Sequence, residues 1–313
     1  MKKSTSGVLA LLRGSTYRSV RLTSSLAAAL LVKLFEQSVV RTFIMSMTVS
    51  RLVWSALLTG IVLIPIIVYS EPTIKPRGAC GISYPSDATI QWECRTLRVG
   101  ESLETLFDEQ WIVVARFNRS DRRHVHAGVS IKVPKQIQDV EYFSPLPLLY
   151  FAAEQERRCI LVNLSEQFLG AYEYGVLRFA VPIASGNGHD ETPTGEFRLT
   201  AAHRAHQSCR YTVEGTDRPY PMNYALRFHI NRDGVSYWIH GRDLPGYPAS
   251  HGCIGLYDEP MQKEQYGYPK SPELNDAKRL FEWVLGGEVE DDRLIALTNG
   301  PRVHILGKAP SQR

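Results

Sequence analysis

The sequence has few cysteines and little net charge, and each shortage excludes a class of function. The 36 lysines and arginines nearly balance the 32 aspartates and glutamates. This balance predicts no nucleic-acid partner, because such proteins present a strongly basic surface. None of the five cysteines belongs to a Cys-x-x-Cys pair. That absence argues against a zinc ribbon and against a thioredoxin-type redox site.

An uncharged apolar run lies near the N-terminus. Residues 52–70, LVWSALLTGIVLIPIIVYS, are long enough to cross a bilayer. Residues 1–51 carry an excess of lysine and arginine, which is typical of a segment retained on the cytoplasmic side. The run can be a cleaved signal peptide or an uncleaved anchor, and a start at Met45 or Met47 would give a signal peptide of normal length. Either way we expect residues after 71 to be exported, to the periplasm or the cell-wall side of the inner membrane, with no other membrane contact.

Export makes disulfides possible, and an odd number of cysteines leaves at least one thiol unpaired. Residues 71–95 form a loop-like stretch with little core of its own. Cys80 and Cys94 lie close together in this stretch. We therefore expect these two cysteines to form a disulfide.

Residues 96–134 have the pattern of a small strand–helix–helix–strand unit. An extended piece at 96–99 leads to a turn at Gly100, where Glu101 or Ser102 can cap a helix. A second helical stretch follows, and a final alternating strand closes at a proline. The unit resembles a LysM module, a small sugar-binding unit of cell-wall proteins, at Val99-Gly100-Glu101-Ser102-Leu103, Asn118, Gly128 and Ile131-Lys132-Val133-Pro134. The alternative is a small structural domain without a ligand.

The rest of the chain has the pattern of a mainly β domain. Residues 135–158 contain prolines and are interpreted as a linker. Across 159–308, short segments rich in β-branched and aromatic residues alternate with polar or glycine turns. Helical periodicity appears only at 273–287, where two glycines end it. We predict a β-sandwich or barrel with few helices, preceded by the small unit at 96–134.

Cys253 is the residue on which the function depends. With His240 and His251 it could supply three metal ligands, but a structural zinc site needs four, so no metal is predicted. The alternative of an inert buried thiol is disfavoured, because Ser250 and Gly252 are small neighbours that permit a sharp turn and close approach of a substrate. The remaining interpretation is a nucleophile.

A cysteine nucleophile needs a base for its proton and N–H donors for the developing oxyanion. The N–H groups of Gly252 and Cys253 can provide the donors. His240 ends an apolar strand, and His251 lies two residues before the thiol, so spacing alone leaves both as candidate bases. An imidazolium beside the thiolate would lower the pKa of Cys253 below its usual value of about 8.5.

Residues 159–307 resemble the YkuD-type catalytic domain of the L,D-transpeptidases. The matching pieces, in the order of the family, are ILVNLSEQFLGAYEYG, TPTGEF (192–197), IHG (239–241) and SHGCIGLYD (250–258). The resemblance implies that Cys253 is the nucleophile and His240 the base, with the main-chain carbonyl of Gly241 orienting the imidazole.

The resemblance also implies the walls of the site. His251 would hold the loop and line the site together with Ser250 and Gly252, while Thr194 and Gly195 would shape the wall near the donor peptide. Two features depart from the family. The loop between His240 and Ser250 is short, and position 255, usually arginine or asparagine, is glycine; Arg242, Arg227 or Arg210 can substitute.

The implied reaction is formation of 3→3 cross-links in peptidoglycan. The thiol would attack a stem tetrapeptide, release D-Ala and form a thioester, which the amine of a second stem resolves. Water as acceptor would instead give an L,D-carboxypeptidase, and a wall-binding protein without turnover is the third alternative. No cofactor is implied. The expected partners are stem peptides and glycan strands, and the protein is expected to be a monomer.

Overall fold

The computed structural model of the protein describes residues 78–311. The segments expected at 1–51 and 52–70, and the first residues of the segment 71–95, lie outside the described residues. Within the part that is described, no helix combines the length and the apolar character needed to span a bilayer.

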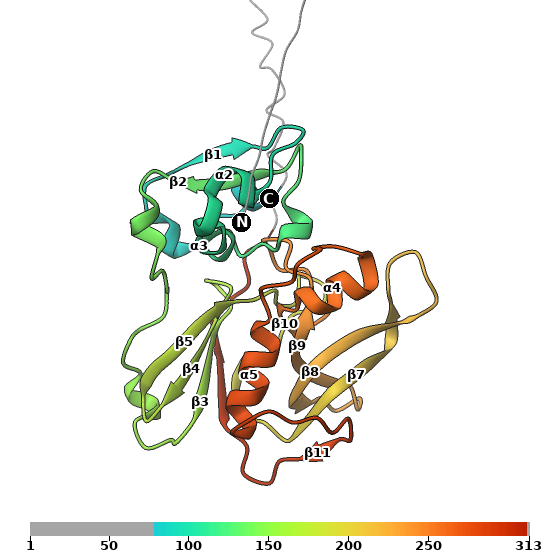
Figure 1. Cartoon of the computed structure of the whole chain (residues 1–313). Helices are drawn as coiled ribbons and strands as arrows, with labels where there is room; N and C mark the ends of the chain where they lie inside the picture. The colour runs from blue at the N-terminus through green and yellow to red at the C-terminus, as the bar shows by residue number, and fades with distance from the viewer. Residues whose placement is uncertain (1–77, 312–313) are drawn as a thin grey trace, which may run out of the picture. The chain divides into compact units, whose positions relative to one another are not determined.

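Two five-stranded sheets make up most of the described chain after residue 158 (Figure 1). The first has the order β5-β4-β3-β12-β6 and consists of β3 (Cys159–Asn163), β4 (Phe168–Glu173), β5 (Val176–Pro182), β6 (Gly195–Arg198) and β12 (Arg302–Leu306). The second has the order β10-β9-β8-β7-β11 and consists of β7 (Ala201–Thr212), β8 (Pro219–Ile230), β9 (Ser236–Arg242), β10 (Ile254–Tyr257) and β11 (Ile295–Ala296). Two pairs, β3 with β12 and β9 with β10, are parallel.

Helix α5 (Asp276–Leu285) packs into the core that the two sheets share (Figure 1). The Asn275 side chain accepts from the Lys278 N–H at 2.9 Å and begins the helix, and Gly286 ends it at φ 84°. Its apolar face reaches both sheets through Leu280 and Phe281. Burial of each of these side chains contributes about 1.5–3 kcal/mol. The mainly β fold with few helices is confirmed.

Some element boundaries differ from those that the sequence predicts. Residues 195–203, GEFRLTAAH, form one run of strand character in the sequence but divide into β6 and β7. After β6 the Leu199 N–H donates to the carbonyl of Pro301, just before β12 in the first sheet, and the Thr200 N–H donates to the carbonyl of Arg227 in β8 of the second sheet. Helix α4 (Glu259–Tyr266) was not predicted. It is mostly polar and therefore lacks an apolar period, and it begins where the Asp258 side chain accepts from the Met261 N–H at 3.1 Å.

The N-terminal part of the described chain has the order strand, two helices, strand. Its elements are β1 (Trp92–Thr96), α2 (Leu103–Phe107), α3 (Trp111–Asn118) and β2 (Ser130–Pro134), and β1 pairs antiparallel with β2. Ser102 caps α2 as expected. The first strand ends at Thr96 instead of beginning there. Val99 is 93% exposed, and the chain turns at Val99 and at Gly100 (φ 86°), as predicted, with the Glu101 N–H donating to the Arg98 carbonyl at 3.1 Å.

Short 3₁₀ helices connect these elements, and a disulfide ties down the start of the described chain. The 3₁₀ helices are η1 (Ala79–Gly81), η2 (Pro85–Thr89), η3 (Asp108–Gln110), η4 (Arg122–His124), η5 (Ile137–Val140) and η6 (Phe151–Ala153). Cys80 of η1 is bonded to Cys94 of β1, the pair expected from the sequence, with their Cα atoms 5.9 Å apart. Cys159, Cys209 and Cys253 are free thiols.

The N-terminal elements share a core with the β domain. Trp111 and Val114 of α3 belong to the same buried cluster as Leu244 and Tyr257. Residues 135–158, which the sequence suggested as a linker, also pack: Leu146 and Ala153 are buried against β3 and β4. All described residues belong to one compact unit. The N-terminal elements are thus fixed on the β domain by apolar packing.

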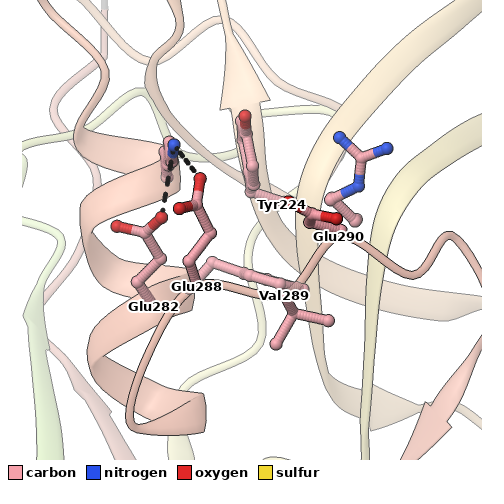
Figure 2. A pocket seen from close by; sticks show the side chains of 8 residues that line it. Tyr224, Glu282, Glu288, Val289 and Glu290 are labelled. Atoms are coloured by element: carbon pink, nitrogen blue, oxygen red, sulfur yellow. Dashed lines mark hydrogen bonds and ion pairs between the residues drawn. The ribbon is translucent and has the colours of Figure 1, made fainter.

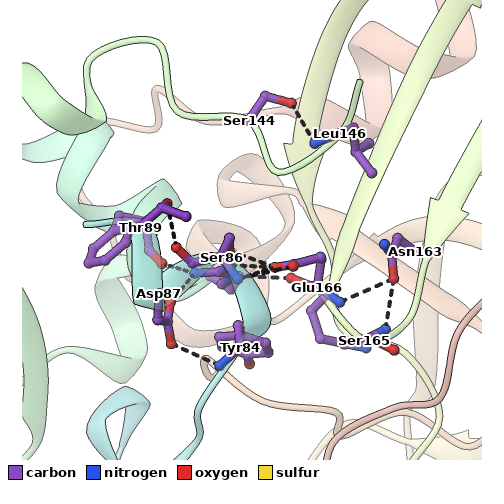
Figure 3. A network of polar contacts seen from close by, with 12 residues as sticks. Tyr84, Ser86, Asp87, Thr89, Ser144, Leu146, Asn163, Ser165 and Glu166 are labelled. Atoms are coloured by element: carbon purple, nitrogen blue, oxygen red, sulfur yellow. Dashed lines mark hydrogen bonds and ion pairs between the residues drawn. The ribbon is translucent and has the colours of Figure 1, made fainter. Parts of the chain in front are cut away.

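Buried polar contacts reinforce this junction (Figure 3). The backbone N–H of Ser86 donates to Oε1 of Glu166 at 3.0 Å, and the Ser86 hydroxyl donates to Oε2 at 2.6 Å. The Arg119 guanidinium is fully buried, lies 4.0 Å from the centre of the Tyr84 ring and donates to the carbonyl of Glu166 at 3.2 Å. Elsewhere Arg122 holds the buried carboxylate of Glu259 through two hydrogen bonds, of 2.7 and 2.5 Å.

Candidate active site

Cys253 and His240 lie on the same face of the second sheet. Along β9, Ile239 is in the central core, so its neighbours Trp238 and His240 point to the opposite face. Cys253 directly precedes β10 and packs against the small apolar cluster that contains Trp238. The parallel pairing sets Gly255 opposite His240, and Cys253 lies two residues before it. The fold thus brings the expected nucleophile and base together on neighbouring strands.

The segment after β5 holds the loop that carries Cys253. The carbonyl of Ser185 accepts from the N–H groups of Ala249 and Ser250 at 3.0 and 2.9 Å. Ala184 and Gly255 exchange two hydrogen bonds, of 3.0 and 2.9 Å. The side chain of Gln167 in turn fixes Ser185, bonding both its N–H and its hydroxyl. These contacts position the thiol through the main chain and make Ser185 and Gln167 supporting residues that the sequence did not reveal.

Gly252 needs to be glycine for two reasons. Its φ of 100° lies in the left-handed region that disfavours side chains. A Cβ built on it would also lie 2.6 Å from Cε1 of Tyr237 and 3.4 Å from the carbonyl oxygen of Glu191. The loop therefore turns sharply just before Cys253, with the Tyr237 ring against it.

The imidazole of His240 is buried and held in one orientation. Its Nδ1 lies 2.8 Å from the carbonyl oxygen of Gly241. A carbonyl only accepts, so Nδ1 carries the proton and Nε2 is the free base in the neutral ring. Gly241 itself is tightly packed: a Cβ there would collide with Oδ2 of Asp258 and lie 2.7 Å from its Cβ. The carbonyl that orients His240 is thus fixed by contact with a buried aspartate.

Thiol and imidazole are both neutral at pH 7. Burial lowers the pKa of His240 to about 3, the hydrogen bond to Gly241 opposes this shift, and the Arg242 charge adds to it. Burial also raises the pKa of the Cys253 thiol, although a main-chain hydrogen bond from Trp238 and the charge of Arg242 oppose this. The lowered thiol pKa expected from an ion pair is therefore not found. Proton transfer to His240 has to accompany attack by the sulfur.

The structure separates the two histidines that the spacing had left equivalent. His251 is exposed, and its ring stacks on that of Tyr211 in β7, with centroids 4.1 Å apart and an interplanar angle of 16°. Its role in lining the site stays a prediction. Ser250 is buried, and its carbonyl accepts from the Asn187 N–H at 3.0 Å. His240 is the one with an oriented, buried ring.

Residues in and next to the segment TPTGEF support the nucleophile loop, while the role of Thr194 and Gly195 as a site wall stays a prediction. Thr194 and Gly195 are exposed, and Gly195 opens β6, paired with Ile305. Instead the buried Thr192 hydroxyl accepts from the Gly186 N–H at 2.8 Å, and the carbonyl of Glu191 approaches Gly252. The start of the motif therefore supports the nucleophile loop.

A cavity of about 280 Å³ lies elsewhere, between β8 and α5 (Figure 2). Its lining includes Tyr224 and Lys278 but neither Cys253 nor His240. Lys278 lies 2.7 Å from Glu288 and 3.4 Å from Glu282, so the lysine that lines the cavity pairs with two of its glutamates. This arrangement offers no reactive group.

The N-terminal elements hold the loop that follows β9. The Leu244 N–H donates to Oδ2 of the buried Asp121 at 2.6 Å, and Nε2 of Gln262 donates to the same oxygen, also at 2.6 Å. The Tyr84 hydroxyl donates to the carbonyl of Gly246 at 2.8 Å. The short loop 242–250 is thus supported from outside the β domain.

We expect Asp121→Ala to destabilise the protein and to lower its activity. The change leaves the Leu244 N–H without its acceptor, which costs about 1–3 kcal/mol, and removes one of the two acceptors of Nε2 of Gln262. Urea unfolding and the rate of the folded variant at low temperature provide the measurements, with the exposed Asp139→Ala as the matched control. Equal stability of the two variants would contradict the supporting role.

Comparison with known proteins identifies the β domain. Residues 157–305 match the family model for the L,D-transpeptidase catalytic domain, YkuD, which confirms the resemblance of this region. No curated protein matches the chain.

Solved structures similar to the chain include three L,D-transpeptidases. The one from Stackebrandtia nassauensis is 20% identical with a TM-score of 0.33, covering 50% of this chain and 58% of that one. The one from Xylanimonas cellulosilytica is 19% identical with a TM-score of 0.39, covering 68% and 98%. L,D-transpeptidase 3 from Mycobacterium tuberculosis is 16% identical with a TM-score of 0.31, covering 48% and 61%. The match thus spans less than two thirds of the first and third of these proteins.

Proposed function

We propose that the protein is an exported peptidoglycan L,D-transpeptidase, since residues 157–305 match the catalytic domain of that family. The observation that carries the proposal is the position of Cys253 and the buried His240 on one face of neighbouring strands, with Nδ1 of His240 held on the carbonyl of Gly241 at 2.8 Å. This arrangement leaves Nε2 free to accept a thiol proton.

The first half of the reaction releases D-Ala. Cys253 Sγ attacks the carbonyl carbon between the third and fourth residues of a stem tetrapeptide while its proton passes to Nε2 of His240. The N–H groups of Gly252 and Cys253 stabilise the oxyanion. The carbon–nitrogen bond then breaks, the proton moves from His240 to the leaving amine, and a thioester remains on Cys253.

The second half forms the cross-link. The side-chain amine of a second stem attacks the thioester carbonyl and gives a proton to His240. The carbon–sulfur bond breaks, and the proton returns to Cys253. The product is a 3→3 cross-link, and no cofactor takes part in these steps. Positioning of the acceptor determines whether an amine or water reaches the thioester.

The experiment is to incubate the purified protein with disaccharide tetrapeptides and to resolve the products by mass. We expect a cross-linked dimer that has lost one D-Ala. A tripeptide product alone would overturn transpeptidation in favour of the L,D-carboxypeptidase. Absence of any product, together with retention on insoluble peptidoglycan, would favour a wall-binding protein. The sugar-binding role of residues 96–134 stays a prediction, which the same retention assay tests.

A further inference from the structure

Gly255 provides space that the side chain of Arg242 fills. A Cβ built on Gly255 would collide with Cγ and Cδ of Arg242 and lie 3.3 Å from its Cβ. The two residues belong to the paired strands β9 and β10, in which Gly255 is opposite His240. Arg242 therefore leans across to the neighbouring strand and covers the position where the family usually has an arginine or asparagine side chain.

Arg242 shares the face of the sheet on which the proposed catalytic pair lies. It follows His240 by two residues on β9, so both side chains leave the strand on the same side. Its charge lowers the pKa values of both Cys253 and His240, which shows that the guanidinium is near each of them. The site thus has a cation next to the nucleophile.

The guanidinium of Arg242 makes no ion pair with any acidic side chain in residues 78–311. Its Nε is buried without a hydrogen-bond partner. The adjacent Asp243 is engaged elsewhere, by Nε2 of Gln262 at 2.9 Å and by the Tyr266 hydroxyl at 3.3 Å. By contrast, the buried Arg122 is fully paired with Glu259. An arginine left with free donors beside a nucleophile is suited to bind a carboxylate of the substrate.

We propose that the unpaired donors of Arg242, whose side chain lies over Gly255, bind the free carboxylate of the terminal residue that the reaction releases. The inference rests on the proposed function and adds a determinant of specificity. In a stem tetrapeptide this carboxylate is separated by a single carbon from the nitrogen of the bond that breaks. A cation near Cys253 can therefore hold the leaving residue while the thiol attacks. Substrates without a terminal carboxylate at this position would lose the contact.

The test compares two substrates, a disaccharide tetrapeptide with a free terminal carboxylate and the same compound as its terminal amide. We expect the native protein to prefer the free acid by about 10–100-fold in kcat/KM, the range for a hydrogen bond to a charged group. In Arg242→Ala, kcat/KM for the free acid should fall to about the value for the amide, and kcat/KM for the amide should change little. Arg232→Ala, an exposed arginine after β8, is the matched control and should keep the preference.

A double variant distinguishes binding from folding. Arg242→Ala/Gly255→Arg returns a guanidinium to the same face from the neighbouring strand and should regain much of the preference, with thermal unfolding confirming that both variants fold. The proposal is overturned if Arg242→Ala slows both substrates equally or if the native protein does not distinguish them. In either case release of D-Ala by the native protein leaves the proposed function standing. A native protein that releases none refutes the function itself.

Discussion

Cys253→Ala should abolish turnover and leave the fold intact. The thiol is the atom that forms the thioester, so its loss removes the covalent route, and we expect a decrease on the order of 10⁶-fold, as for nucleophile removal in serine proteases. Cys253 is only partly buried and contacts the cluster around Trp238 at its edge. Loss of one sulfur from this edge should cost little stability.

The measurement combines the rate of D-Ala release with intact-protein mass spectrometry of the acylated intermediate. The native protein should gain the mass of the acyl tripeptide, and the variant should not. Cys209→Ala is the control, because Cys209 is a free thiol that is exposed on β7. If Cys253→Ala still released D-Ala at the native rate, the thioester mechanism would be wrong.

His240→Gln should have the second largest effect. A general base typically contributes about 10²–10⁴-fold to the rate, and glutamine cannot accept the thiol proton. His251→Gln should have a much smaller effect, because that ring is exposed and stacked on Tyr211. Rates of D-Ala release for the two variants test the assignment. A greater loss in His251→Gln would reverse the roles.

The pH profile provides a second test of His240 in the native protein. Its folded pKa is lowered to about 3, so the ring remains an unprotonated base as the pH falls through 6.5. We therefore expect kcat/KM to change little between pH 7 and pH 5. An acidic limb with a midpoint near 6.5 would show that the active base is solvated like an ordinary histidine.

Local sequence patterns predicted much of the fold because they depend on neighbouring residues. The short β-branched runs became β3, β4 and β5, and the amphipathic period at 273–287 became α5. Helix α4 could not be predicted in the same way, because its first turn depends on the side chain of Asp258 and it has no apolar stripe. Strand β11 (Ile295–Ala296) is shorter than the apolar pattern around it, because only two of its residues pair with β7.

The features of the candidate site likewise fall into those that local motifs predict and those that depend on the tertiary structure. Cys253, His240 and Gly241 stand in motifs that can be read along the chain, and the hydrogen bond from Nδ1 to Gly241 joins sequence neighbours. The packing of Arg242 over Gly255 depends on the register between β9 and β10, which a local sequence pattern does not predict. The electrostatic expectation was wrong for a related reason. Burial, which the sequence does not reveal, lowers the pKa of His240 and raises the pKa of Cys253.

The buried Arg119 has a consequence for how such proteins can evolve. Its guanidinium lies among Tyr84, Asp87 and Glu166, with groups from both sides of the junction satisfying its donors. Transplanting residues 78–134 onto another catalytic domain would remove Glu166 and leave the Nε donor of Arg119 buried without its acceptor, at a cost of about 1–3 kcal/mol. The N-terminal elements therefore cannot be moved to another catalytic domain without a loss of stability. Changes at this junction are expected to be inherited together, as compensating pairs on the two sides.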